Sequence, residues 1–581
     1  MLRASLERPD RLAAITNESG AWQAWAWDVE RDRRRRVSDA PLGVEHADIT
    51  PDGSHVVWWL DETGDESGRW MASPFDGGSS GPLAPDVPRG WANGLSMVPG
   101  AIAIGIVTEE EGFRVFVVRG DEALERYRHP IPAGQSDEFE GWTLGLSADG
   151  RTLVTRTAEA GDIEITALRA IDVESGETIA EIGDDGSRLV PVAWSPIPGD
   201  GRLLALHERE GWMRPTIWSP RSGERDDIDP GLEGELTPFA WFPDARSILL
   251  RCSRDGRDGL IRLDLESRVV ATVLEPGTVE DSIVRADGSV WARTHATTTP
   301  PRWIDGDGQE VVRLGDSAEP PGHPARAFWV DRGSGPRIQA WLLEPEAEGP
   351  HPTIVSIHGG PNWHHTDGYE PQVQAYVDHG YAVLLVNYRG STGFGRAFRE
   401  AIRGHLGTHE SDDVNAALDH AIEAGWVDAD RVVLEGWSWG GYLATLNAGR
   451  RPDRWRAVCA GIPVGDYVAS HYESAPELRA WDVAMFGDPV EEAERYRNGN
   501  PITYVEDVRA PILLIAGEHD SRCPLGQVMT YAVALKALGK SVELHLYPGG
   551  HHANATEEQV IHVELTTGFF ERAIAAIPAP R

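Results

Sequence analysis

Hydrophobic positions in residues 1 to about 325 fall in short runs that end in Asp-Gly or Pro-Asp turns, and few segments have helical spacing. One unit recurs in this half of the chain. An apolar run ends in a turn at Pro or Ala, as in ITPDGSHVVWW and LSADGRTLVT, and a second apolar run follows at once. The turn residues follow one another at steps of 48, 49, 48, 47 and 43 residues: Pro51, Pro99, Ala148, Pro196, Pro243 and Ala286. A weaker seventh member lies 42 residues earlier, at Pro9.

A second pair of apolar runs lies between successive turns, as in ALRAIDVESGETIAEI, LIRLDLESRVVATVL and AWAWDVERDRRRRV. Four short strands every ~40 to 50 residues is the period of a β-propeller blade, whose neighbours bury faces that a single blade leaves exposed. A β-sandwich has the same strand content, but its strands do not repeat at this step. We therefore predict an N-terminal seven-bladed β-propeller over residues 1–325.

After about residue 325 the pattern changes to apolar runs that alternate with amphipathic helices. The runs TIVSIHGG, YAVLLVNY, RVVLEGWS, RAVCAGIP, PILLIAGEHD and VELHLYPGG indicate strands. The segments DDVNAALDHAIEAGW, GGYLATLNAG, GQVMTYAVALKALG and EQVIHVELTTGFFERAI indicate helices. This order predicts a C-terminal α/β domain over residues 326–581, with a doubly wound, mostly parallel sheet and functional residues at the carboxyl ends of its strands.

Composition agrees with two domains, because 581 residues exceed what one hydrophobic core usually organises. The net charge of −38 disfavours nucleic acid and anionic membranes as partners. The cysteines Cys252, Cys459 and Cys523 are far apart and in no metal-ligand spacing, so we expect no disulfide framework, no metal and no cofactor. Neither a signal-peptide core nor a membrane-length apolar stretch is present, which predicts a cytoplasmic protein.

The stretch LEGWSWGGYLA places Ser438 inside G-x-S-x-G. This pattern arises by chance, and Ser79 in GGSSG is a second match, but Ser79 lies in a polar, turn-rich stretch. Ser438 instead follows a β-branched run and precedes a predicted helix. A nucleophile elbow needs that strand, turn and helix, so Ser438 is the candidate nucleophile.

A serine nucleophile needs a base and an acid that orients the base, and in an α/β-hydrolase these follow in the order Ser, acid, His. Asp520 lies just beyond a predicted strand, 82 residues after Ser438. His551 and His552 follow side by side, and because adjacent side chains point in different directions, only one of them can face the serine. The residues alone leave both open.

An acyl-transfer site also needs hydrogen-bond donors for the oxyanion. The predicted strand TIVSIHGG ends in His358-Gly359-Gly360, similar to the HGGG-type loop that supplies one backbone N–H. Gly360 is the favoured donor there, and Trp439, directly after the nucleophile, is the second. A tight turn alone would also account for the glycines, and His358 is assigned a structural hydrogen-bonding role.

Together, HGGPN, NYRGSTGFG, GWSWGGYLA, MFGDPVEEAERYRNGNPITYVEDVRAPILLIAGEHDSRCP and the final His segment occur in the order and spacing of one family. The chain resembles the prolyl oligopeptidase family of serine peptidases, closest to its acylaminoacyl-peptidase and dipeptidyl-peptidase-like branches. The resemblance implies that Ser438 is the nucleophile and Asp520 the orienting acid. In that family Tyr-Pro is followed after three residues by the catalytic histidine, which points to His552; His551 departs from the Gly or Thr often found at its position.

The resemblance also places substrate-binding residues. Arg522 matches an arginine near the carbonyl or carboxylate groups of the substrate, and Val464, Tyr467 and Tyr472 match the pocket for the residue before the cleaved bond. An exposed turn arginine and ordinary packing are the alternatives. The propeller is implied to cap the active site and to admit only short or unstructured peptides.

The predicted function is a cytoplasmic serine exopeptidase of the aminopeptidase or acylaminoacyl-peptidase type, acting on short peptides through an acyl-enzyme. Alternatives are a carboxylesterase, a dipeptidyl-peptidase or oligopeptidase, and a propeller scaffold with a decayed hydrolase half. Dipeptidyl-peptidases hold the free amino terminus with a glutamate pair; the acidic stretches DEFEGW (137–142) and TEEEGF (108–113) offer such residues without indicating a pocket. Family members often form dimers or larger assemblies, so a homo-oligomer stays open.

Overall fold

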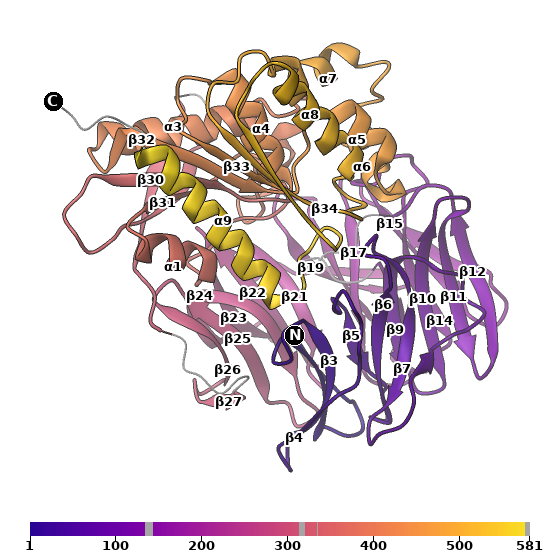
Figure 1. Cartoon of the computed structure of the whole chain (residues 1–581). Coiled ribbons are helices and arrows are strands. Elements are labelled where there is room, and N and C mark those ends of the chain that lie inside the picture. The colour runs from indigo at the N-terminus through magenta and orange to yellow at the C-terminus, as the bar shows by residue number, and fades with distance from the viewer. Residues whose placement is uncertain (134–142, 313–319, 334, 576–581) are drawn as a thin grey trace. The chain divides into compact units, whose positions relative to one another are not determined.

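The computed structural model describes residues 1–133, 143–312, 320–333 and 335–575 (Figure 1). The chain divides into two compact units. Unit 1 comprises Met1–Thr294, Arg302–Ser317 and Ala475–Ala484, and unit 2 comprises His295–Pro301, Ala318–Ser474 and Met485–Arg581.

The described residues before 313 form five antiparallel sheets. The first contains β1 (Leu2–Ala4), β2 (Arg11–Thr16), β3 (Gln23–Asp28) and β4 (Arg33–Arg36). The second contains β5 (Ala47–Ile49), β6 (His55–Asp61), β7 (Ser67–Pro74), β8 (Gly81–Pro82), β9 (Gly90–Val98), β10 (Ala101–Thr108), β11 (Gly112–Arg119) and β12 (Glu122–His129). The third contains β13 (Leu144–Leu146), β14 (Thr152–Thr157), β15 (Ala167–Asp172) and β16 (Thr178–Ile182). The fourth contains β17 (Leu189–Trp194), β18 (Leu203–His207), β19 (Arg214–Ser219) and β20 (Glu224–Asp227). The fifth contains β21 (Glu235–Trp241), β22 (Ser247–Arg254), β23 (Arg257–Asp264), β24 (Val270–Val284), β25 (Val290–Ala296), β26 (Thr299–Asp305) and β27 (Glu310–Val312).

The repeated turns of the sequence join neighbouring strands in these sheets. Pro9 lies between β1 and β2, Pro51 between β5 and β6, and Pro99 between β9 and β10, and each pair of strands is antiparallel. The remaining repeated turns likewise join neighbours: β13 to β14, β17 to β18, β21 to β22, and β24 to β25. The predicted second pairs are also hairpins, namely β3 with β4, β15 with β16, and β23 with β24.

Apolar clusters join each sheet to the next along the chain, because alternate residues of every strand point to opposite faces and both faces of these sheets carry apolar side chains. The last cluster joins the two ends of this series. Leu2 and Trp27 of the first sheet share a core with Trp291 and Trp303 of the fifth. The five sheets thus form a closed series, in which the last sheet packs against the first. A propeller buries its sheet faces in this way and leaves only short edges exposed.

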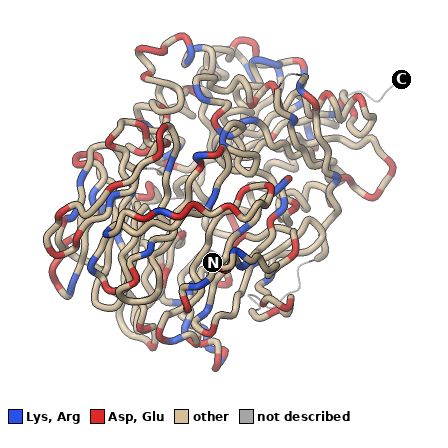
Figure 2. Tube along the Cα trace, turned by 180° about the vertical axis from the view of Figure 1, so that it is seen from behind, with Lys and Arg blue, Asp and Glu red and all other residues tan. Residues whose placement is uncertain are grey.

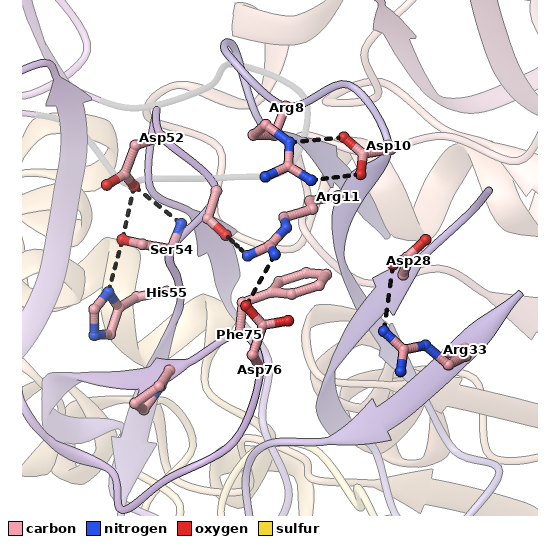
Figure 3. A network of polar contacts seen from close by, with 12 residues as sticks. Arg8, Asp10, Arg11, Asp28, Arg33, Asp52, Ser54, His55, Phe75 and Asp76 are labelled. Atoms are coloured by element: carbon pink, nitrogen blue, oxygen red, sulfur yellow. Dashed lines mark hydrogen bonds and ion pairs between the residues drawn. The ribbon is translucent and has the colours of Figure 1, made fainter. Parts of the chain in front are cut away.

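Polar contacts also connect the first sheet to the second (Figure 3). The guanidinium of Arg11, on β2, lies 4.4 Å from the ring centroid of Phe75 and donates to the Gly53 carbonyl (3.0 Å) and the Asp76 carboxylate (2.9 Å). Elsewhere on the chain, acidic and basic residues are interspersed rather than gathered in one place (Figure 2). This distribution fits a charge of −38 that mainly keeps the surface solvated.

Unit 2 contains a sheet in the order β28-β29-β31-β30-β32-β33-β34-β35. Its strands are β28 (Ala325–Val330), β29 (Ile338–Leu343), β30 (His351–Ile357), β31 (Ala382–Asn387), β32 (Val427–Trp437), β33 (Val458–Gly461), β34 (Ile512–Gly517) and β35 (Val542–Tyr547). The pairs β28/β29 and β29/β31 are antiparallel, and all later pairs are parallel. The predicted, mostly parallel sheet is confirmed, and its parallel strands present their carboxyl ends at one edge.

Helices lie between these strands. They are α1 (Pro371–Asp378), α2 (Arg396–Arg399), α3 (His409–Glu423), α4 (Trp439–Arg450), α5 (Tyr467–Glu473), α6 (Pro476–Phe486), α7 (Ala493–Gly499), α8 (Leu525–Ala537) and α9 (Thr556–Ala575), with 3₁₀ turns η1 (Glu400–Ile402) and η2 (Pro501–Tyr504). The four predicted helices correspond to α3, α4, α8 and α9. Buried side chains of α1 and α9, including Tyr376 and Phe570, pack on the sheet. Among the described residues, every helix is too short or too polar to cross a bilayer.

Candidate active site

Ser438 lies in a strained turn between β32 and α4. Its φ of 55° and ψ of −119° belong to a backbone region that non-glycine residues rarely adopt. The backbone segments around this turn approach one another so closely that glycine is required both before and after Ser438. A Cβ on Gly436 would lie 2.3 Å from the Gly440 carbonyl oxygen, and a Cβ on Gly440 would lie 2.0 Å from the Ile357 carbonyl oxygen. The turn has the backbone form of a nucleophile elbow.

His551 contacts both Ser438 and Asp520. Its Nε2 lies 3.0 Å from Ser438 Oγ, and its Nδ1 lies 2.9 Å and 3.1 Å from the two Asp520 oxygens. Asp520 follows β34 and His551 follows β35, so parallel strands deliver all three side chains to the same edge of the sheet. This is the serine, base and acid arrangement that activates a hydroxyl.

The resemblance pointed to His552 as the base, but the structure places His551, not His552, against Ser438. The His552 side chain is exposed, and its ring stands at 83° to the ring of His551. The reason is local: the Tyr547 hydroxyl donates to the Gly550 carbonyl (2.8 Å), and the His519 N–H donates to the Gly549 carbonyl (2.9 Å). These bonds hold the loop in a path that turns residue 551, rather than residue 552, toward the serine.

Asp520 is almost completely buried. Burial alone would raise its pKa, but the neighbouring His551 ring and the backbone N–H groups of Cys523 and Arg522, each 2.8 Å from Oδ1, outweigh burial and leave the pKa below its ordinary value. The carboxylate therefore stays ionised at neutral pH and accepts the Nδ1–H of His551. Cys523, also buried, lies beside this pair but is in no disulfide.

The His358-Gly359-Gly360 turn lies against the nucleophile. A Cβ on Gly359 would be 3.3 Å from Ser438 Cβ, and Gly360 has a φ of 109°. His358 is buried, which lowers its pKa, and its ring stacks on Tyr388 at 4.2 Å. The His358 Nε2 lies 2.9 Å from the Ser391 hydroxyl, so this histidine supports the turn and does not face Ser438.

The candidate substrate-binding residues differ in exposure. Tyr467 is buried, with its ring 6.0 Å from that of Trp439, and Val464 is buried and accepts a hydrogen bond from Thr445 through its carbonyl (2.9 Å). Tyr472 is 58% exposed, and the Arg522 side chain is exposed beside the Asp520 loop. Tyr467 thus belongs to the packing behind the elbow, whereas Tyr472 and Arg522 lie at the surface.

Sequence reasoning missed Glu410, which is fully buried at the start of α3. Burial raises its pKa to about 8, the negative charge of Asp413 adds to the shift, and the neighbouring Trp439 indole offsets part of it. Asp413 is held separately by Arg389, at 2.8 Å. An acidic run such as HESDD normally indicates a solvated surface, so nothing in the sequence pattern marked this carboxyl as buried.

Two acidic stretches, TEEEGF (108–113) and DEFEGW (137–142), were candidates for binding the free amino terminus of a peptide. In TEEEGF, Glu111 pairs with Arg128 at 3.0 Å and Glu109 pairs with Arg479 at 2.6 Å, so both carboxylates already have cationic partners. DEFEGW lies outside the described residues.

Comparison with known proteins gives matches in both sequence and structure. Residues 368–576 match the model of the prolyl oligopeptidase family. The uncharacterized peptidase YuxL of Bacillus subtilis is 32% identical over 222 residues, which cover 38% of this chain and 34% of that protein. The acylamino-acid-releasing enzyme of Rattus norvegicus is 35% identical over 353 residues, which cover 56% of this chain and 48% of that protein. The chain thus matches half or less of the length of these curated relatives.

A solved structure extends the likeness to the whole chain. The puromycin-hydrolyzing peptidase of Mycobacterium tuberculosis superposes with a TM-score of 0.82 at 18% identity, covering 100% of this chain and 95% of that one. At this identity the likeness shows the fold, a many-stranded propeller domain followed by an α/β-hydrolase domain. The sequence match, the fold and the arrangement around Ser438 agree: residues 368–576 of this chain are similar to the prolyl oligopeptidase family.

Proposed function

We propose that the protein is a serine exopeptidase that hydrolyses short peptides near their N-terminus, as an aminopeptidase or an acylaminoacyl-peptidase. One observation carries this proposal: the imidazole of His551 lies within hydrogen-bond distance of Ser438 Oγ on one side and of the Asp520 carboxylate on the other. That arrangement is suited to acyl transfer, in which a hydroxyl must lose its proton as it attacks a carbonyl.

In the proposed mechanism, Ser438 Oγ attacks the carbonyl carbon of the scissile bond while His551 Nε2 takes the hydroxyl proton. The backbone N–H groups of Gly360 and Trp439 stabilise the resulting oxyanion. His551 then gives its proton to the leaving amine, and the C–N bond breaks to leave an ester on Ser438. Water enters, loses a proton to His551 and hydrolyses the ester by the same steps in reverse. Throughout, Asp520 orients the ring and stabilises the imidazolium.

The printed names of the relatives support a peptide-like substrate. The rat relative is an acylamino-acid-releasing enzyme, and the structural neighbour from Mycobacterium tuberculosis is described as a puromycin-hydrolyzing peptidase. Arg522, exposed beside the Asp520 loop, is the proposed contact for a substrate carbonyl or carboxylate, and Val464, Tyr467 and Tyr472 are the proposed pocket side chains.

We propose seven blades for the N-terminal domain (1–325), followed by the catalytic domain (326–581). The two long sheets supply two blades each: β5–β8 with β9–β12, and β21–β24 with β25–β27. Support comes from the seven repeated hairpins and from Val57 and Ile104, which belong to opposite halves of the second sheet yet share one core. As in the family, this domain would limit access to short peptides. The cytoplasmic location and the homo-oligomer stay predictions.

Kinetics on matched anilides test the proposal. The same amino acid is offered as a free aminoacyl, an N-acetyl-aminoacyl and a dipeptidyl anilide, together with its p-nitrophenyl ester, and Ser438→Ala is the control. We expect hydrolysis of the free or the acetylated aminoacyl anilide, with activity lost in the variant. Hydrolysis of the ester alone would assign a carboxylesterase, and preference for the dipeptidyl anilide would assign a dipeptidyl-peptidase.

A further inference from the structure

A second cluster of chemically reactive side chains lies on β35 and α9, and the proposed catalytic mechanism does not use it. It consists of His545 on β35 and of Glu558 and His562 on α9. The Nε2 of His545 lies 2.6 Å from Glu558 Oε1, and the Nε2 of His562 lies 3.2 Å from the same oxygen. Three potential ligand atoms from two elements thus converge within 4.8 Å of one another.

Ordinary hydrogen bonding accounts for only part of this arrangement. The His545 ring makes a good hydrogen bond to Glu558. His562, in contrast, is only 5% exposed, and its buried Nε2 has no well-aligned hydrogen-bond partner among the described residues although Glu558 Oε1 is near. Burying a ring nitrogen whose one polar contact is poorly aligned is costly, so this nitrogen points to a ligand.

The geometry fits a metal ion of zinc type. Two imidazole nitrogens and one carboxylate oxygen are a common protein ligand set for Zn²⁺, with water in the fourth position. Bonds of about 2.0–2.1 Å in a tetrahedron place neighbouring ligand atoms roughly 3.3 Å apart. The separation between His562 and Glu558 already has this length, and a small movement of the half-exposed His545 ring would bring the third ligand into place.

The rings are held in position by the rest of the fold. Glu558 and His562 are four residues apart on one face of α9. The His562 ring packs against Trp437, with centroids 5.3 Å apart, and against Tyr547, with centroids 4.9 Å apart. Such packing gives a metal ligand a defined direction, and the partly exposed His545 and Glu558 leave a way in for an ion and a water molecule.

We propose that His545, Glu558 and His562 form a binding site for a divalent transition-metal ion such as Zn²⁺. The site joins the last strand of the sheet to the C-terminal helix. Because the ion binds the folded state, it raises the stability of the connection between β35 and α9. The proposal is independent of the proposed function, since it requires no hydrolysis.

Zinc binding to the full-length protein tests this directly. After removal of metal with a chelator, Zn²⁺ is titrated by calorimetry into the wild type and into three variants: His545→Gln, Glu558→Gln and, as a matched control, His379→Gln, which changes an exposed histidine on unit 2. We expect binding of one equivalent in the wild type and control, affinity lowered by at least about 10- to 100-fold in both ligand variants, and a zinc-dependent rise in Tm that only the wild type and control show.

X-ray absorption at the zinc edge identifies the ligands in the wild type, so the test does not depend on the folding of any variant. We expect two imidazole ligands and oxygen, without sulfur. A sulfur ligand would place the ion at Cys523, beside Asp520 and His551, and would overturn the proposal. Unchanged affinity in folded His545→Gln and Glu558→Gln proteins, or no binding by the wild type, would overturn it as well.

Discussion

At the scale of single residues, Glu410 shows how burial changes the chemistry around the nucleophile. The Glu410 side chain is fully buried at the start of α3, next to Trp439 and to the ion pair between Asp413 and Arg389. Its pKa of about 8 means that it is largely protonated at neutral pH. A neutral acid adds no second negative charge beside Asp413.

Glu410 should make stability depend on pH. In the unfolded chain it ionises at its ordinary pKa of 4.5, but in the folded chain only at about 8. Between these values the folded state keeps a proton that the unfolded state has lost, so its stabilising contribution, complete below pH 4.5, is lost as pH rises toward 8. We expect Glu410→Gln to be more stable than the wild type at pH 8, by on the order of a few kcal/mol, and similar at pH 4.5.

Chemical denaturation of both proteins across this pH range measures the difference. Glu423→Gln is the matched control, because Glu423 lies on the same helix but is exposed. The control should follow the wild type. A Glu410→Gln protein whose stability runs parallel to the wild type at every pH would show that Glu410 is ionised in the folded state.

The histidine pair marks the limit of residue-level prediction from sequence. Ser438 and Asp520 were identified because each follows an apolar strand, and strand ends determine where side chains gather. His551 and His552 follow the same strand, and the choice between them depends on the path of the loop residues 548–550. That path is set by hydrogen bonds such as Tyr547 to Gly550, which no sequence pattern displays.

At the scale of elements, the elbow depends on how closely α4 packs behind the strands. Gly440 lies in the first turn of α4, so close to β30 that a methyl group would be 2.0 Å from the Ile357 carbonyl oxygen. Backbone cannot move aside cheaply at that distance, so the position of the helix and of Ser438 depends on glycine here.

We expect Gly440→Ala to destabilise the protein by about 1–3 kcal/mol or more and to reduce hydrolysis, because the helix must shift away from β30. Helix propensity alone predicts the opposite sign, since Ala is favoured over Gly by about 1 kcal/mol within a helix. Gly568→Ala on α9 is the matched control, because its nearest neighbour is the flexible end of Arg572, 3.7 Å away. Thermal unfolding should show a lower Tm for the first variant only; equal or higher Tm values for both would refute the close approach.

The parallel strands of unit 2 were predictable because they are continuous apolar runs, and α3, α4, α8 and α9 because they are long. The short helices α1 and α5 were not predicted. α5 has only seven residues and is started by a side-chain cap, Asp466 accepting from the Ala469 N–H at 3.3 Å. Such a helix depends on tertiary packing, for example of Tyr467 on Tyr442, more than on its own periodicity.

At the scale of the whole molecule, unit 1 is held closed by contacts between the two ends of its strand series. Leu2 of β1 is fully buried in the cluster that contains Trp303, and Arg3 pairs with Asp281 at 3.1 Å. Contacts of this kind join residues far apart in sequence, so they stabilise the series as a whole.

Leu2→Ala should therefore destabilise unit 1 by about 2–5 kcal/mol, the usual range for truncating a buried leucine. Leu6→Ala is the matched control, because Leu6 is 63% exposed in the same segment and its truncation should have little effect. Denaturation followed by tryptophan fluorescence measures both. Equal stabilities for the two variants would mean that the N-terminal strand does not close the series.

The repeat could be predicted from the sequence because its turn residues recur at a nearly constant step. The sequence did not predict where one sheet ends and the next begins. Strands β7 and β9 pair through Ser67 and Gly68, so two expected blades are continuous as one hydrogen-bonded sheet. Long-range pairing of this kind depends on how neighbouring repeats meet and leaves no local pattern in the sequence.

The rate at which a fluorophosphonate labels Ser438, with the labelled residue identified by mass spectrometry, tests the central claim most directly when wild type, His551→Gln and His552→Gln are compared. We expect labelling at Ser438 in the wild type, a rate within a few-fold of it in His552→Gln, and a rate lower by on the order of 10³-fold or more in His551→Gln. Equal labelling of folded His551→Gln and wild type, or no labelling of Ser438 in the folded wild type, would contradict the claim.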